Sequence, residues 1–124
     1  MKSDLNVLVV DDEPLIRWSI REVLRESGHE VAEASDGASA VQQLSDGERF
    51  DVVVLDFRLP DSNDLRLLET IRRLTPGSAV IMMTAFGTPE TVAGALALGA
   101  SRVLPKPFDV HDLASLVAQV SGAH

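Results

Sequence analysis

The sequence contains no cysteine, no tyrosine and one tryptophan, and aromatic residues make up 4% of its 124 residues. Without cysteine, disulfides and thiolate metal sites are excluded, which suits a reducing compartment. The apolar runs are strand-sized, far shorter than the roughly 20 residues that a membrane-spanning helix needs. The first residues, MKSDLN, contain no signal-peptide core. We therefore expect a cytoplasmic protein that does not enter a membrane.

Positive charge is also scarce. Lysine and arginine total 11 against 19 aspartates and glutamates, which gives a formal net charge of −8. Because contacts with nucleic-acid phosphates require clustered basic residues and these are scattered, direct nucleic-acid binding is not expected. The length fits one domain, which we place at residues 1–124.

Strand signals alternate with helix signals along the chain. Continuous apolar runs predict buried strands at 7–10, 52–55 and 80–83, and weaker signals predict strands at 29–34 and 103–104. Helical spacing and stop signals predict helices at about 14–27, 38–44, 65–74, 89–98 and 109–120. Five strand-helix repeats imply an α/β fold: a doubly wound five-stranded parallel sheet with five helices.

Polar side chains stand where four of these strands end, and parallel strands bring their carboxyl ends to one edge of a sheet. Taken singly, each residue has a simple structural interpretation as a turn residue, a helix cap or a solvated lysine. Together they resemble a reaction site, because three carboxylates need a cation and oxygen-only ligands favour Mg²⁺. The residues are Asp11, Asp12, Asp56, Thr84 and Lys106.

The same residues have the chemistry that phosphoryl transfer needs. An aspartate beside Mg²⁺ can act as a nucleophile toward a phosphoryl group, which favours Asp56 because it ends the most apolar run. The ammonium of Lys106 and the hydroxyl of Thr84 can each pair with a phosphoryl oxygen. Ala85 is small enough to leave room for a phosphodonor.

The motifs VVDDE, LDFRLP, MTAFGTPE, LGAS and LPKPFD occur in the order and spacing of one family. The chain resembles the receiver domain of two-component response regulators over nearly all of residues 5–120. The resemblance implies a flavodoxin-like (receiver) topology and a site whose residues have assigned roles. It makes Asp56 the phosphoacceptor, Asp11, Asp12, Asp56 and the backbone carbonyl of Arg58 the metal ligands, Thr84, Ala85 and Lys106 the switch and phosphoryl-binding residues, and Pro107 a cis-proline.

The finer pattern IRWSI, RLP, MTAFG and PKPFD is most similar to receivers of NtrC-like transcription activators, which precede a sigma-54-dependent ATPase module and a DNA-binding module. This resemblance implies a phosphoprotein in a phosphorelay, with a sensor histidine kinase as phosphodonor. It also implies a homodimer formed on phosphorylation and an output in transcription regulation. The domain would promote only its own phosphorylation and dephosphorylation, so we do not expect an enzyme.

Two departures leave the signalling route open. Val103 stands where many receivers carry an aromatic residue three positions before the lysine, and Phe86 lies in the loop after Thr84. We treat Phe86 and Val103 as candidates for a partner surface. A degenerate receiver that binds a partner without phosphorylation is therefore an alternative. A dehalogenase-type phosphatase is another, but Pro14 and Arg58 occupy the positions where it would need an acid/base aspartate.

Other polar residues have simpler interpretations. Asp61 and Asp64 are expected to be solvated turn acids, with Asp64 capping the following helix. The three histidines, His29, His111 and His124, lie at the edges of predicted elements, and we expect them at the surface.

Overall fold

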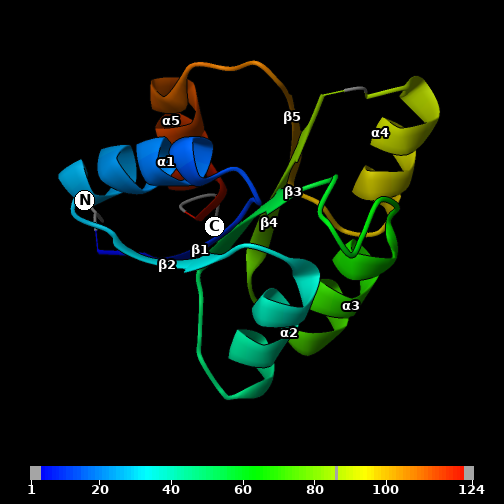
Figure 1. Cartoon of the computed structure of the whole chain (residues 1–124), viewed down its shortest axis with the longest axis horizontal. Helices are drawn as coiled ribbons and strands as arrows, with labels where there is room; N and C mark the ends of the chain where they lie inside the picture. Colours follow the sequence, from blue (N-terminus) through cyan, green and yellow to red (C-terminus); the bar gives the residue numbers. More distant parts are fainter. Residues whose placement is uncertain (1–3, 86, 122–124) are drawn as a thin grey trace.

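The computed structural model describes residues 4–85 and 87–121, in which strands and helices alternate (Figure 1). None of the helices in these residues is long and apolar enough to cross a membrane. The elements are β1 (Asn6–Val10), α1 (Pro14–Glu26), β2 (Glu30–Ala34), α2 (Gly37–Ser45), β3 (Val52–Asp56), α3 (Arg66–Leu74), β4 (Ala79–Thr84), α4 (Pro89–Ala97), β5 (Arg102–Pro105) and α5 (Val110–Ser121).

All five strands are parallel and form one sheet in the order β2-β1-β3-β4-β5. The order reverses beside β1, which has β2 on one side and β3 on the other. Binding sites in open sheets of this kind lie outside the carboxyl ends of the strands, at this switch point. The predicted doubly wound five-stranded fold is confirmed.

Helices cover both faces of the sheet (Figure 1). On one face, α1 and α5 pack on Val7 and Val9 of β1 through a core that includes Ile20 and Leu113. On the other, α2, α3 and α4 cover Leu8 and Val10 through residues that include Leu68, Ile71 and Ala95. Because successive side chains of a strand point to opposite faces and both faces are covered, the central strands read as continuous apolar runs.

The boundaries differ from the predicted ones by at most one residue, but the predicted position of one histidine is wrong. His29 is buried, at 6% exposure, and its Nδ1 accepts a hydrogen bond from the backbone N–H of Leu5 at 3.2 Å. The prediction that His29 lies at the surface is therefore wrong. His111 is exposed as expected, and His124 lies outside the described residues.

Candidate functional site

Lys106 joins two strand ends that are far apart in the sequence. Its Nζ lies 3.1 Å from Asp11 Oδ2 and 3.2 Å from Asp56 Oδ2. The two carboxylates are almost fully buried and the Lys106 side chain is 14% exposed. The parallel register produces this meeting, because β1, β3 and β5 all end at the same edge of the sheet.

The predicted acidic cluster is present. One carboxylate oxygen from each of Asp11, Asp12 and Asp56 lies within 4.8 Å of the others. Asp11 also has the structural role expected of it, because its Oδ1 accepts a hydrogen bond from the N–H of Glu13 at 2.8 Å, just before α1. Asp12 is exposed, so the cluster opens to solvent. An all-oxygen donor set with one open side could hold a hard divalent cation.

The electrostatics of Asp56 point the same way. The pKa of the Asp56 carboxyl is raised from 3.8 to about 6, because burial and, after it, the charge of Asp11 raise the pKa more than Lys106 and the N–H of Arg58 lower it. Burial lowers the pKa of Lys106, but Asp11 and Asp56 together raise it on balance. The raised pKa of Asp56 shows that Lys106 does not offset the combined effect of burial and the charge of Asp11, which fits a site for an added cation.

A surface pocket of about 390 Å³ opens over this cluster. Residues from four strand-end loops line it, namely Asp12, Glu13, Asp56, Arg58, Leu59, Pro60, Ala85 and Lys106. Thr84 is buried at the end of β4, and its carbonyl accepts the N–H of Lys106 at 2.8 Å. Of the predicted switch residues, Ala85 and Lys106 line the pocket, and Thr84 is buried beside them at the end of β4.

The loop after β3 is anchored to α2. Asp61 is exposed as predicted, but its carboxylate also accepts hydrogen bonds from the N–H groups of Gly37 at 2.8 Å and Ala38 at 3.0 Å. Asp64 accepts from the N–H of Arg66 at 2.9 Å, but the N-cap position of α3 is Leu65, so Asp64 lies one residue before the capping position and not at it, contrary to the prediction. Asp61 thus fixes the loop that follows Asp56 to the beginning of a neighbouring helix.

The remaining predicted residues lie at the margin of the site. The N–H of Arg58 approaches Asp56 Oδ1 at 3.4 Å, and the Arg58 side chain is exposed. The Lys106–Pro107 peptide bond is cis, as the resemblance implies. Val103 is half-buried and packs against the core beneath α2, α3 and α4. The predicted role of Phe86 lies outside the described residues.

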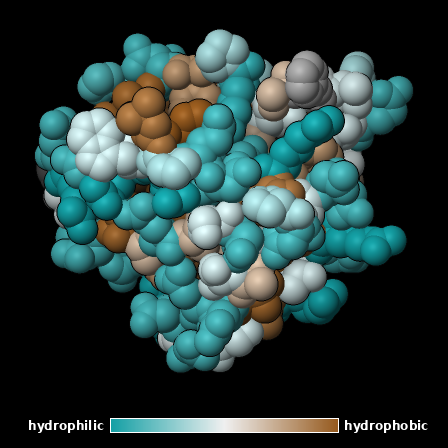
Figure 2. All heavy atoms as spheres, viewed as in Figure 1, coloured by the Kyte–Doolittle hydropathy of each residue, from teal (hydrophilic) through white to brown (hydrophobic). Residues whose placement is uncertain are grey.

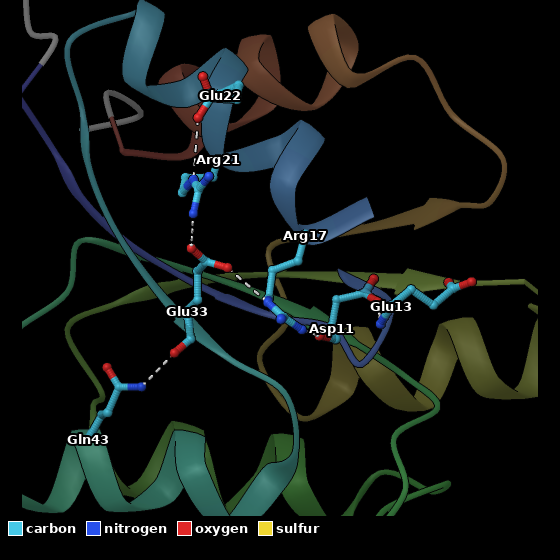
Figure 3. A network of polar contacts seen from close by, with 7 residues as sticks. All are labelled: Asp11, Glu13, Arg17, Arg21, Glu22, Glu33 and Gln43. Carbon is cyan, nitrogen blue, oxygen red and sulfur yellow. Dashed lines mark hydrogen bonds and ion pairs between the residues drawn. The ribbon is translucent and has the colours of Figure 1, made fainter. Parts of the chain in front are cut away.

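Sequence reasoning missed a polar network beneath the acidic pair. Glu33 of β2 binds both Arg17 and Arg21 of α1, and Arg17 reaches the backbone of Asp11 (Figure 3). Glu13 also lies close, with its Oε1 3.5 Å from Lys106 Nζ. Glu13 and Arg17 are four residues apart, which is a spacing typical of a helix. The ion pair between Arg17 and Glu33, however, joins residues 16 positions apart, so no local sequence pattern predicts it.

An apolar groove of about 530 Å³ adjoins the site on the side of α1 and α5. Lys106 and Ala85 line both this groove and the pocket over the cluster. Leu15, which also lines the groove, is 73% exposed, and Trp18 on the same helix is 51% exposed. Figure 2 shows apolar atoms gathered on this face of the molecule.

The sheet order and the strand-end cluster define a class of signalling domain. Residues 7–118 match the response regulator receiver domain, and the chain belongs to that family. It is 35% identical over 115 residues to the DNA-binding transcriptional regulator NtrC of Azospirillum brasilense. That match covers 93% of this chain and 24% of NtrC, so the chain spans about a quarter of this relative.

Solved structures show the same fold. A CheY-like receiver domain protein from Methanospirillum hungatei JF-1 superimposes with a TM-score of 0.91 at 28% identity, over 97% of this chain and 95% of that one. A response regulator from Burkholderia pseudomallei, solved with a phosphorylated aspartic acid, calcium ion and citrate, gives 0.81 at 26% identity, over 97% of this chain and 74% of that one.

Proposed function

We propose that residues 1–124 form one receiver domain that accepts a phosphoryl group on Asp56 from a sensor histidine kinase. The observation that carries this proposal is the bridge from Lys106 to Asp11 and Asp56, which surrounds a buried carboxylate with a cation and a second acid. The phosphorylated aspartic acid in the Burkholderia pseudomallei relative supports it.

The metal ligands in this proposal are the carboxylates of Asp11, Asp12 and Asp56 and the backbone carbonyl of Arg58. The carboxylate oxygens already lie close together and offer only oxygen donors, which suits Mg²⁺. When bound, Mg²⁺ supplies positive charge to the oxygens of the transferring phosphoryl group. The calcium ion in the relative is consistent with a divalent cation in this class of site.

The residues of the chain account for the transfer itself. With a pKa of about 6, Asp56 is mostly ionised at neutral pH, and a carboxylate oxygen can attack the phosphorus of a phosphohistidine. The new bond is P–O, the P–N bond breaks, and the imidazole nitrogen leaves with its electron pair. Lys106, which already pairs with Asp56, is placed to pair with a phosphoryl oxygen.

Transfer would change the charge of the site and so bias the conformation. The phosphoryl group carries about −1.5 to −2 charges, and we propose that the ammonium of Lys106, which lines the pocket, and the hydroxyl of Thr84, at the end of β4, bind it. Since Val103 cannot act as an aromatic switch, we propose that the signal travels through Thr84 and α4. The domain would turn over no separate substrate beyond its own phosphorylation and dephosphorylation.

The wider setting follows from the resemblance to NtrC. We propose a cytoplasmic phosphorelay protein that forms a homodimer on phosphorylation and acts in transcription regulation. Its output would pass to a sigma-54-dependent ATPase module and a DNA-binding module, as in activators of that type. The similarity to a DNA-binding transcriptional regulator supports this output class.

The decisive experiment is phosphorylation with acetyl phosphate and Mg²⁺, followed by intact mass spectrometry. Wild type is expected to gain one phosphoryl group, because a small phosphodonor can enter the pocket over Asp56. Asp56→Asn should gain none, and EDTA should abolish the gain. Asp64→Asn is the matched control, because it makes the same charge change in the loop after β3 while retaining a side-chain oxygen that can accept from the N–H of Arg66.

Three results would contradict the proposal. Equal phosphorylation of Asp56→Asn and wild type would place the phosphoryl group elsewhere. No phosphorylation of wild type, with partner binding unchanged in Asp56→Asn, would favour a degenerate receiver. Turnover of an external phosphate ester would favour a phosphatase, although Arg58 stands where that enzyme needs an acid.

A further inference from the structure

Arg17 connects the acidic pair to the edge strand β2. Its Nε donates to Glu33 Oε1 at 2.9 Å, and its Nη1 donates to the backbone carbonyl of Asp11 at 2.6 Å (Figure 3). Arg21, one turn further along α1, donates to the other Glu33 oxygen at 2.7 Å. Both arginines therefore share Glu33, and the bond to Asp11 is made by Arg17.

The carbonyl that Arg17 holds has a particular place in the site. It belongs to the peptide unit that joins Asp11 to Asp12, and that unit is planar. A hydrogen bond that fixes the oxygen therefore also fixes the direction in which the chain enters Asp12. The orientation of this one peptide determines where the two neighbouring carboxylates project.

Asp11 is held at other points as well. Its N–H donates to the carbonyl of Ala34, its Oδ1 accepts from Glu13, and its Oδ2 accepts from Lys106. Asp12 is exposed, and its backbone lies between two hydrogen bonds, that of Arg17 to the Asp11 carbonyl and that of the Glu13 N–H to Asp11 Oδ1. The contact with Arg17 therefore matters more for the placement of Asp12 than for that of Asp11.

Glu33 gives Arg17 a firm support. The side chains of Arg17 and Glu33 are 18% and 28% exposed, so solvent screens this pair less than an open surface pair. Burial raises the pKa of Glu33, but hydrogen bonds and charge from Arg21 and Arg17 lower it on balance, so it stays ionised at neutral pH. Gln43 also donates to the Glu33 carbonyl at 2.9 Å and anchors its backbone.

We infer that Arg17, supported by Glu33, is a positioning residue that sets the Asp11–Asp12 peptide in the orientation that binds a divalent cation. This inference rests on the proposed Mg²⁺ site. Because the carboxylate of Glu33 neutralises the charge of Arg17, we expect Arg17 to affect the metal site by orienting the Asp11–Asp12 peptide and not through its charge. Groups that orient metal ligands in this way typically change metal affinity by about 10–100-fold when they are removed.

The test is an amide NMR titration with MgCl₂ at constant ionic strength on wild type, Arg17→Gln and Arg21→Gln. Arg17→Gln is expected to bind Mg²⁺ about tenfold more weakly, at the lower end of the range for such residues. Arg21→Gln should bind it at least as tightly as wild type does, because Arg21 donates to Glu33 and Glu22 and not to Asp11. Each variant removes one positive charge from the same network, and this loss by itself would strengthen Mg²⁺ binding. Weaker binding in Arg17→Gln therefore reports lost orientation.

Thermal unfolding in EDTA separates this role from a purely structural one. Both variants lose one ion pair with Glu33, and Arg17→Gln also loses the hydrogen bond to the Asp11 carbonyl, so both should remain folded with a small loss of stability that is larger for Arg17→Gln. Equal Mg²⁺ affinities of Arg17→Gln and wild type would overturn the inference while leaving the metal site intact. Equal weakening in both variants would also overturn it. If wild type binds no Mg²⁺, the proposed function fails together with the inference. Asp12→Asn should lose Mg²⁺ binding and serves as the reference for a destroyed metal site.

Discussion

At the scale of single residues, the site is a balance between burial and charge. Asp56 carries a raised pKa because it is buried and lies near Asp11, and Lys106 only partly offsets this. A carboxyl whose folded pKa lies above its unfolded value makes the folded state less stable once it is ionised. The reactive group is therefore also a source of instability in the metal-free protein.

This imbalance predicts a pH-dependent effect of Asp56→Asn on stability. Below pH 3.8 the carboxyl is neutral in both states, and above about 6 it is ionised in both, so its unfavourable effect develops between those values and persists at higher pH. In EDTA, Asp56→Asn should therefore be more stable than wild type by about 1–3 kcal/mol at pH 7.5. The difference should disappear near pH 4.

Urea unfolding at the two pH values measures this difference. Asp64→Asn is again the control, because Asp64 is exposed and should give no such pH-dependent gain. A destabilised Asp56→Asn at pH 7.5 would mean that the ion pair with Lys106 outweighs burial and the charge of Asp11.

At the scale of elements, the central strands were the most predictable part of the fold. β1, β3 and β4 are covered on both faces, so their sequences are continuous apolar runs. The edge strands were harder to delimit. β5 extends from Arg102 to Pro105 because it pairs with Ile81–Thr84, and this partner fixes its length rather than its own composition.

Long-range contacts were not predictable from local patterns. His29 has polar neighbours in the sequence, yet its ring is buried, where its Nδ1 accepts a hydrogen bond from the backbone N–H of Leu5. The five strand-end residues could be predicted because the parallel topology alone brings them together. The support from Arg17 and Glu33 could not, because it depends on how a turn of α1 lies over β2.

The connection from α4 to β5 also depends on a close approach. Gly99 has a φ of +105°, and a Cβ at this position would lie 2.7 Å from Nε of Arg72. Arg72 in turn donates from Nη1 to the carbonyl of Ser78 at 2.6 Å, which ties α3 to the start of β4. Gly99 therefore provides both a left-handed backbone and room for this arginine.

We predict that Gly99→Ala is more destabilising than Gly47→Ala. Gly47 has a similar φ of +90° but has no atom within 4 Å of its Cβ position, so Gly47→Ala should report backbone strain alone, about 1–3 kcal/mol. Gly99→Ala should cost about 1 kcal/mol more, because Arg72 must give up the Ser78 carbonyl. Chemical denaturation measures both, and equal losses would show that Arg72 moves aside without losing its bond.

At the scale of the whole molecule, the two helical layers present different surfaces. The layer of α1 and α5 exposes Leu15 and Trp18 beside an apolar groove that reaches Lys106 (Figure 2). The layer of α2, α3 and α4 exposes Leu96, at 48%, on α4. The pocket over Asp56 lies at the strand ends between the layers, so the proposed phosphodonor protein could contact the first surface while its phosphoryl group reaches Asp56.

This arrangement predicts that Leu15→Ser slows phosphoryl transfer from a kinase more than from acetyl phosphate. A loss of roughly tenfold is expected if burial of Leu15 contributes about 1.5 kcal/mol to the docked complex, the lower end for a large apolar side chain. Acetyl phosphate needs only the pocket, so its rate should not change. The measurement uses an autophosphorylated histidine kinase that phosphorylates wild type.

Leu96→Ser is the control for this prediction, because it removes an exposed leucine from the other layer. It should leave both rates unchanged. A similar slowing by Leu96→Ser and Leu15→Ser would place the kinase contact elsewhere or on both layers. Slowing of the acetyl phosphate reaction by Leu15→Ser would instead indicate that the substitution disturbs the pocket.

The bridge made by Lys106 also has a consequence for protein synthesis. Lys106 lies 95 residues after Asp11 and 50 after Asp56 in the chain. A ribosome therefore delivers both acids well before it delivers their ammonium partner. In the nascent chain the carboxylates of Asp11 and Asp56 lack this partner until β5 has emerged and joined the edge of the sheet.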